Sequence, residues 1–126
     1  THDDGKEKLA SLLGEADSAL DSFVEELKAQ GLWDDVVIVV GSEFGRTLTN
    51  NGAGTDHAWG GNYWMLGGSL RGKQVIGQYP SDLTDSGPLN LGRGRLVPTT
   101  SWDAIWNAVA EWFDVNNIRS MLPNKD

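Results

Sequence analysis

Hydrophobic residues recur along the first quarter of the chain with the spacing of one face of an α-helix. Successive apolar positions are four and three residues apart, and serine and glutamate fill the positions between them, which is typical of an amphipathic helix. The pattern predicts a helix over residues 6–30 that lays one face on a sheet and ends at Gly31. The apolar positions are Leu9, Leu13, Ala16, Leu20, Phe23 and Leu27.

Residues 36–40 read Val-Val-Ile-Val-Val and are apolar at every position. A strand that is exposed on one face alternates apolar and polar residues, whereas a strand buried on both faces of a parallel sheet does not. A long helix followed by such a strand is a unit of α/β proteins. The sequence therefore predicts an α/β fold with a mainly parallel sheet flanked by amphipathic helices.

The middle of the chain carries weaker patterns. Residues 62–66 predict a second short strand, and residues 74–76 predict another. Residues 79–94 are rich in Gly, Pro, Asp and Ser and therefore predict a loop. At its end, Arg93 and Arg95 form a compact basic spot, which favours a solvated turn over an anion site.

A last helix is predicted near the C-terminal end. Residues 99–101 are Thr-Thr-Ser, whose hydroxyls suit the N-cap of a helix. We interpret residues 1–126 as a single domain, with residues 115–126 as a loose tail. The apolar stripe of the helix is Trp102, Ile105, Val109 and Trp112, widened by Trp106 and Phe113.

Composition narrows the classes of partner. The chain has 126 residues, a formal net charge of -8 and 39% hydrophobic residues, which suits one small globular domain or part of a larger one. The acidic balance argues against nucleic acid, because phosphate backbones are bound by clustered Lys and Arg. No apolar run is long enough for a membrane span. Because the chain has no cysteine, a metal site would need His, Asp, Glu or Asn.

Polar and charged residues begin as soon as the apolar strand ends. In open α/β sheets, ligands bind beyond the carboxyl ends of the strands, so these residues are placed where chemistry is expected. Glu43 is a candidate cation ligand or base, and the alternative is an ion pair with Arg46. The guanidinium of Arg46 matches the geometry of phosphate or sulfate. Ser42 lacks the G-x-S-x-G pattern of a nucleophile elbow, so we do not assign it that role.

Asp56 and His57 lie in a glycine-bracketed stretch, residues 52–61. A neutral imidazole is a common metal ligand, and a neighbouring carboxylate can ligate the ion or orient the ring. The alternative is an aspartate that caps a turn beside a half-buried histidine. His2 is the other histidine of the chain, and two imidazoles with an acid would resemble a zinc or manganese half-site if they met at one edge of the sheet.

Four motifs in this order resemble a known family. They are Thr-His-Asp before a long helix, Val-Val-Ile-Val-Val-Gly-Ser-Glu-Phe-Gly-Arg, Gly-Thr-Asp-His, and Leu-Val-Pro-Thr-Thr-Ser. Together they resemble a bacterial family, domain of unknown function 1501, within the alkaline-phosphatase-like or sulfatase-like superfamily. The resemblance runs over nearly the whole chain and is to the C-terminal portion of longer proteins, so we expect a C-terminal fragment of a larger domain. That the chain begins with Thr1 favours the same expectation.

The resemblance implies a site in which divalent metal, as zinc, manganese or calcium, polarises a phosphate or sulfate ester. His2 is similar to a metal-ligand histidine ahead of a helix, and His57 is similar to the last ligand histidine of the superfamily. Asp56 and Glu43 are further candidate ligands, with Glu43 and Arg46 as candidate catalytic residues. Members of the superfamily that bind two metals show Asp-His after this strand. This chain has Glu43 and Phe44 there, so it lacks the histidine expected of a second metal site.

These observations predict part of a metal-dependent phosphatase-like or sulfatase-like hydrolase acting on a small anionic ester. The resemblance implies a periplasmic or secreted protein. One alternative is a catalytically degenerate cell-envelope module of the same fold, which has a binding or structural role and does not hydrolyse esters. Another is an interaction fragment that completes its sheet with a partner, either a missing N-terminal half or a second copy in a homo-oligomer.

Overall fold

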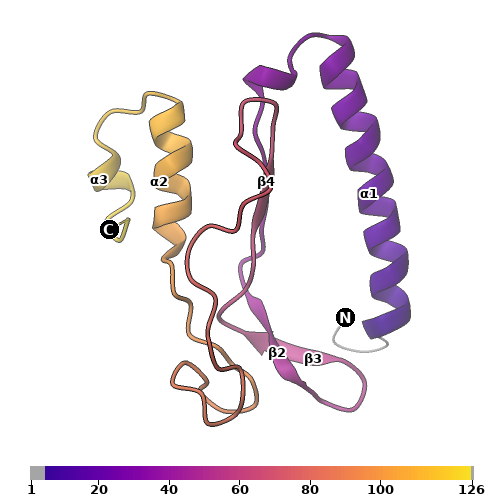
Figure 1. The fold of residues 1–126 in the computed structure, drawn as a ribbon, viewed down its shortest axis with the longest axis vertical. Helices are drawn as coiled ribbons and strands as arrows, with labels where there is room; N and C mark the ends of the chain where they lie inside the picture. Colours follow the sequence, from indigo (N-terminus) through magenta and orange to yellow (C-terminus); the bar gives the residue numbers. More distant parts are fainter. Residues whose placement is uncertain (1–4, 126) are drawn as a thin grey trace.

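The computed structural model describes residues 5–125 of the chain. A long helix, α1, precedes two short strand pairs, and two shorter helices lie near the C-terminal end (Figure 1). The elements are α1 (Gly5–Ala29), the 3-10 helix η1 (Trp33–Asp35), β1 (Ile38–Val40), β2 (Gly45–Asn50), β3 (Thr55–Ala58), β4 (Trp64–Leu66), α2 (Trp102–Trp112) and α3 (Ile118–Met121). None of the helices in residues 5–125 is long and apolar enough to cross a membrane, as the sequence predicts.

The prediction of a mainly parallel sheet is wrong. Strand β1 pairs with β4 in an antiparallel ladder, and β2 pairs with β3 in a second one. The residues of β1 are half-buried, although all three are apolar. A parallel pair needs a crossover connection, usually a helix, whereas only the β2–β3 hairpin separates β1 from β4. An apolar run therefore identified the strand but not the direction of its partner.

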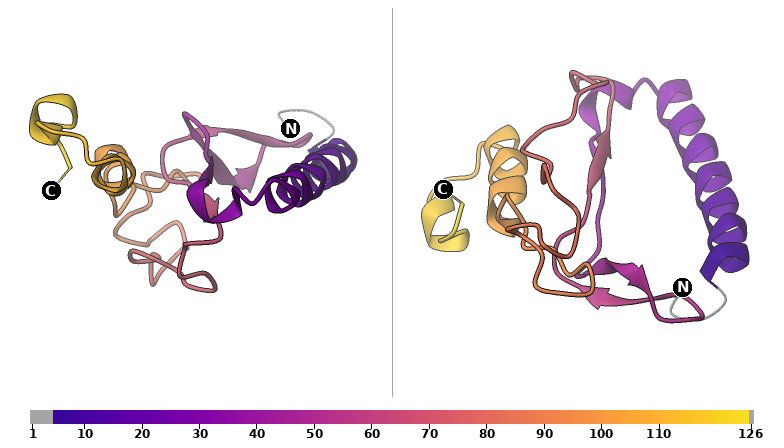
Figure 2. Two further views of the ribbon diagram at one scale, coloured as in Figure 1. Left: turned by 90° about the horizontal axis from the view of Figure 1, so that it is seen from above. Right: turned by 60° about the horizontal axis from the view of Figure 1, so that its bottom comes forward.

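Helix α1 begins and ends close to where the apolar pattern predicts. Gly31 follows it with a φ of 71°, and this left-handed conformation is the usual reason for glycine after a helix. Figures 1 and 2 show α1 on one side of the β1–β4 ladder and α2 on the other, with the β2–β3 hairpin at one end of the ladder. Two helices therefore lie on either side of a ladder of only two strands, and not against the mainly parallel sheet that the sequence predicts.

The glycine-bracketed stretch, residues 52–61, contains part of the turn and the second strand of a β-hairpin. Asn50 pairs with Thr55, and the connection between them is held by asparagine side chains. The Asn50 Oδ1 accepts the Gly52 N–H at 2.6 Å, and the Asn51 Oδ1 accepts the N–H groups of residues 53 and 54 at 3.0 and 2.8 Å. Gly52 has a φ of 105°, a conformation that favours glycine in a turn.

A long connection, residues 67–101, joins β4 to α2. Its predicted strand at residues 74–76 is wrong: Val75 and Ile76 are 87% and 92% exposed and belong to no strand. Farther along, the connection lies against the hairpin, because the Leu48 N–H donates to the Gly94 carbonyl at 3.1 Å and the Gly60 N–H donates to the carbonyl of residue 96 at 2.8 Å. These bonds place the connection against both β2 and the residues that follow β3.

Helix α2 begins at the predicted position. The Ser101 Oγ accepts the Ala104 N–H at 3.1 Å, which confirms the predicted N-cap. The segment interpreted as a tail contains α3, and its Asn124 contacts the start of α2: the Asn124 N–H donates to the Asp103 carboxylate at 2.8 Å.

Little apolar surface is buried within residues 5–125. Leu27, 7% exposed, is the one buried hydrophobic side chain of this part of the chain, and no side chain in it is completely buried. The apolar face of α1 is open, with Leu13 and Phe23 exposed by 59% and 48%. The amphipathic pattern therefore predicted the helix correctly, but its apolar stripe meets no sheet within the described residues.

Candidate functional site

One face of the β2–β3 hairpin carries two of the predicted site residues. Arg46 of β2 lies directly opposite His57 of β3 in the antiparallel register. Phe44 stacks on the His57 ring, with 3.8 Å between ring centroids and 18° between planes. The Arg46 Cζ atom lies 5.2 Å from the centroid of the same Phe44 ring. Because Phe44 contacts both, it holds the guanidinium and the imidazole near one another.

The arginine is oriented by the hairpin itself. Arg46 Nη1 donates to the Thr55 carbonyl at 2.7 Å, and the side chain is half-buried. The sequence left open an ion pair between Glu43 and Arg46, and the structure does not form one among residues 5–125. A guanidinium has five N–H donors in a planar fork, so one bond to a carbonyl leaves donors for an anion.

Asp56 is engaged by its neighbours rather than held open for a ligand. Its Oδ2 accepts from Arg93 Nη2 at 2.6 Å, and its Oδ1 accepts from the Asn51 amide at 2.9 Å. Its backbone N–H donates to the hydroxyl of Thr47 at 3.1 Å. The carboxylate therefore ties the hairpin to the long connection. Its partner, Arg93, belongs to the basic spot that the sequence predicts to be a solvated turn.

The metal set implied by the sequence is not assembled within the described residues. In residues 5–125, no three His, Asp or Glu side chains gather as a group that could hold an ion. His57 is exposed at the hairpin surface, and Asp56 has both oxygens in hydrogen bonds. His2 lies outside the described residues. This part of the chain does not by itself fit a divalent ion.

Glu43 lies in a pocket to which Arg46 does not contribute. It lines a pocket of about 370 Å³ between the end of β1 and α2, together with Tyr63, Trp102 and Trp106. The Tyr63 and Trp102 rings meet edge to face, 5.2 Å apart at 77°. The Trp102 and Trp106 centroids are 5.9 Å apart at 60°. The sequence places both tryptophans on the apolar stripe of the helix, and their partial exposure shows that they also form part of the surface.

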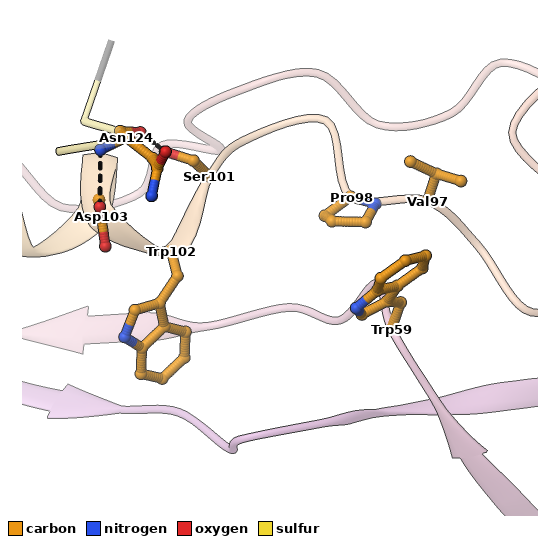
Figure 3. A pocket seen from close by; sticks show the side chains of 7 residues that line it. All are labelled: Trp59, Val97, Pro98, Ser101, Trp102, Asp103 and Asn124. Carbon is orange, nitrogen blue, oxygen red and sulfur yellow. Dashed lines mark hydrogen bonds between the residues drawn. The ribbon is translucent and has the colours of Figure 1, made fainter.

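Trp102 also lines a second pocket, of about 540 Å³ (Figure 3). Trp59 and Trp102 both contribute indole rings to it, and Trp59 is 68% exposed. Pro98 adds an apolar wall. At its polar end, Ser101 donates to the Asn124 carbonyl at 2.6 Å, and the Asn124 N–H donates to Asp103. Trp102 thus lines two pockets, each with aromatic walls.

The fold and this surface define a protein of helices and short antiparallel strand pairs that presents an arginine and a histidine on a hairpin and an aromatic wall beside it. Over residues 1–87, the chain matches the family described as "Protein of unknown function (DUF1501)", and it belongs to that family. No curated protein and no solved structure matches the chain. The family resemblance found in the motifs is confirmed at this level.

Proposed function

We propose that the chain contributes an oxyanion-binding surface to a metal-dependent phosphate or sulfate ester hydrolase-like protein of the alkaline-phosphatase-like superfamily. The observation that carries the proposal is the pairing of Arg46 with His57 on one face of the hairpin. Arginine matches a tetrahedral oxyanion with two parallel N–H donors, and a neighbouring imidazole can donate a further hydrogen bond or ligate a cation. An ester with one phosphate or sulfate group suits this pair.

The proposal assigns the chain a limited share of the site. Arg46 contacts the anion, and the bond from its Nη1 to the Thr55 carbonyl limits how the guanidinium turns. Because residues 5–125 do not gather three ligands, they would supply one or two ligands of a zinc, manganese or calcium ion, with His57 as the first candidate. His2 keeps the ligand role that the sequence predicts for it. Glu43 has no part in this surface, because it lines the pocket beside α2 and not the hairpin face that carries Arg46. Such an ion supplies a Lewis acid that polarises the ester.

Calorimetric titration with inorganic phosphate and sulfate, with and without added zinc, manganese or calcium, tests this proposal. We expect binding that strengthens with one of the cations and falls at least about tenfold in Arg46→Ala, because a charge-assisted pair is lost. Arg71→Ala, which removes an exposed arginine of the long connection, is the matched control and should bind as the wild type does. Equal losses in both variants, or no binding by the wild type, would refute the proposal.

The same titration addresses the catalytically degenerate envelope module. Phosphate binding that no cation strengthens, with no turnover of p-nitrophenyl phosphate or p-nitrophenyl sulfate, would favour a protein that binds the anion without hydrolysing esters.

We also propose, on the resemblance alone, a periplasmic or secreted location. Fractionation of expressing cells tests that location, and a purely cytoplasmic pool would contradict it.

The open face of α1 favours a second candidate function, association with a second copy of the chain. Leu9, Leu13 and Phe23 share one stripe and are 44%, 59% and 48% exposed. Contiguous exposed apolar stripes of this kind are typical of interfaces. Light scattering coupled to size exclusion should show dimers that Leu13→Lys dissociates, whereas Glu15→Lys, on the polar face, should leave them intact. A monomer at every concentration would refute this candidate.

A further inference from the structure

The pocket between the end of β1 and α2 has a rigid aromatic wall. The Tyr63 hydroxyl donates to the Ser42 carbonyl at 2.5 Å, and the Tyr63 ring lies so close to Gly41 that a Cβ there would be 2.6 Å from its Cε1 atom. Trp102 meets this ring at 77°, and Trp106 lies one turn farther along α2, at 60° to Trp102. Rings at steep angles form a bent wall rather than a flat stack.

Glu43 is the acid of this pocket. It is the only charged side chain among the described residues that line the cavity. Its carboxylate makes no hydrogen bond or ion pair with any residue of the described range, 5–125. Aliphatic carbons from Val39 and Ile105 complete the lining. The pocket therefore combines an unpaired negative charge with aromatic and aliphatic surface, in a chain whose net charge is -8.

We infer that this pocket binds a small organic cation, a methylated or alkylated ammonium group, with Tyr63, Trp102 and Trp106 as the aromatic wall and Glu43 as the counter-charge. Aromatic rings attract a cation placed within about 6 Å of their centroids, and methylated ammonium also buries its apolar surface. An inorganic cation fits less well, because it needs oxygen ligands to replace its hydration water and aromatic rings do not offer them. The cavity of about 370 Å³ is large enough for such a ligand.

The second pocket that Trp102 lines is the weaker candidate for this ligand. Its acid, Asp103, already accepts the Asn124 N–H at 2.8 Å (Figure 3). A carboxylate that is used to hold the C-terminal segment has less to offer a cation than the unpaired one of Glu43. The inference does not depend on ester binding, because it uses neither Arg46 nor His57.

Choline titration at constant ionic strength, followed by the indole N–H signals of the six tryptophans in nuclear magnetic resonance spectra, tests the inference. The matched ligand is 3,3-dimethyl-1-butanol, which has the shape of choline without its charge. We expect saturable shifts at Trp102 and Trp106, with Trp112 at the far end of α2 unchanged. The neutral analogue should bind at least about fivefold more weakly, as a desolvated cation–π contact predicts.

Two variants separate the charge from the shape of the pocket. Glu43→Gln alters an exposed side chain, so the fold should persist, and choline affinity should fall by about threefold to tenfold. Glu15→Gln on α1 is the control for net charge and should leave the affinity unchanged. Equal binding of choline and its neutral analogue, equal losses in the two variants, or no shift at Trp102 and Trp106 would each overturn the inference, whatever the phosphate titration shows.

Discussion

Replacing Gly45 with alanine should open the hairpin that carries Arg46 and His57. Gly45 is the first residue of β2 and is buried, and it pairs with Ala58. A Cβ at this position would lie 2.6 Å from the carbonyl carbon of Gly60 and closer still to its oxygen. Real Cβ atoms do not approach backbone this closely, and a backbone carbonyl has no rotamer with which to move aside. The strands must therefore separate.

The magnitude follows from the cost of overpacking. Extra methyl groups in close-packed sites cost about 1 to 3 kcal/mol, and contact with rigid backbone places this one near the upper end, at about 3 kcal/mol. At about 1.4 kcal/mol per factor of ten, the open population of the hairpin should rise by a factor of about 100. Hydrogen exchange of the amides in residues 45–58 measures this population locally, because each segment opens with its own free energy.

Gly14→Ala is the matched substitution with the opposite expectation. Gly14 lies inside α1, where a Cβ would meet nothing within 4 Å. Alanine is favoured over glycine inside a helix by about 1 kcal/mol, so exchange in α1 should slow by about fivefold. Exchange in residues 45–58 of Gly45→Ala that stays within about threefold of the wild type would refute the reasoning, because the hairpin would then tolerate the methyl group.

Three smaller effects test other contacts. Arg93→Ala removes the ion pair with Asp56, which spans 2.6 Å between partners 54% and 29% exposed, and should cost less than about 1 kcal/mol in urea denaturation and still less in high salt. Ser101→Ala should lower the stability of α2 by about 1 kcal/mol through loss of its N-cap, measured by circular dichroism. Hydrogen bonds from the hydroxyl and the backbone N–H of Thr84 lower the pKa of Asp82. The order that these bonds give the loop should therefore be present at neutral pH, and it should be lost as the pH falls from the ordinary aspartate pKa through the lower pKa of the folded state. Thr84→Val should reduce this pH dependence in the nuclear magnetic resonance spectrum.

Local signals in the sequence predicted α1 and α2 well, whereas α3 lies in the segment interpreted as a tail. The apolar spacing predicted α1, Gly31 marked its end, and Ser101 marked the start of α2. The partner of β1 was not predictable in the same way, because an unbroken apolar run fits a parallel or an antiparallel neighbour and periodicity does not distinguish them. The choice depends on contacts between residues 38–40 and 64–66, which are remote in sequence.

The hairpin could have been found from the sequence, whereas the partners of its side chains could not. Asn51-Gly52 lies between segments that contain Thr47, Thr49 and Thr55, which is a hairpin signal, whereas the glycines around it are typical of a loop. By contrast, the ion pair between Asp56 and Arg93 joins residues that are far apart in the chain. Composition also does not predict that Arg93 has a left-handed φ of 59°. The aromatic wall beside Glu43 likewise depends on how α2 lies beside β1.

The most direct test of the proposed oxyanion surface is the response of the His57 ring to phosphate in proton nuclear magnetic resonance spectra. The chain has two histidines, so His57→Ala assigns the ring signals without ambiguity. The account predicts a saturable shift of the His57 signals as phosphate is added at constant ionic strength, lost in Arg46→Ala and kept in Arg71→Ala. Signals of His57 that do not respond to phosphate, or that respond equally in both arginine variants, would contradict it.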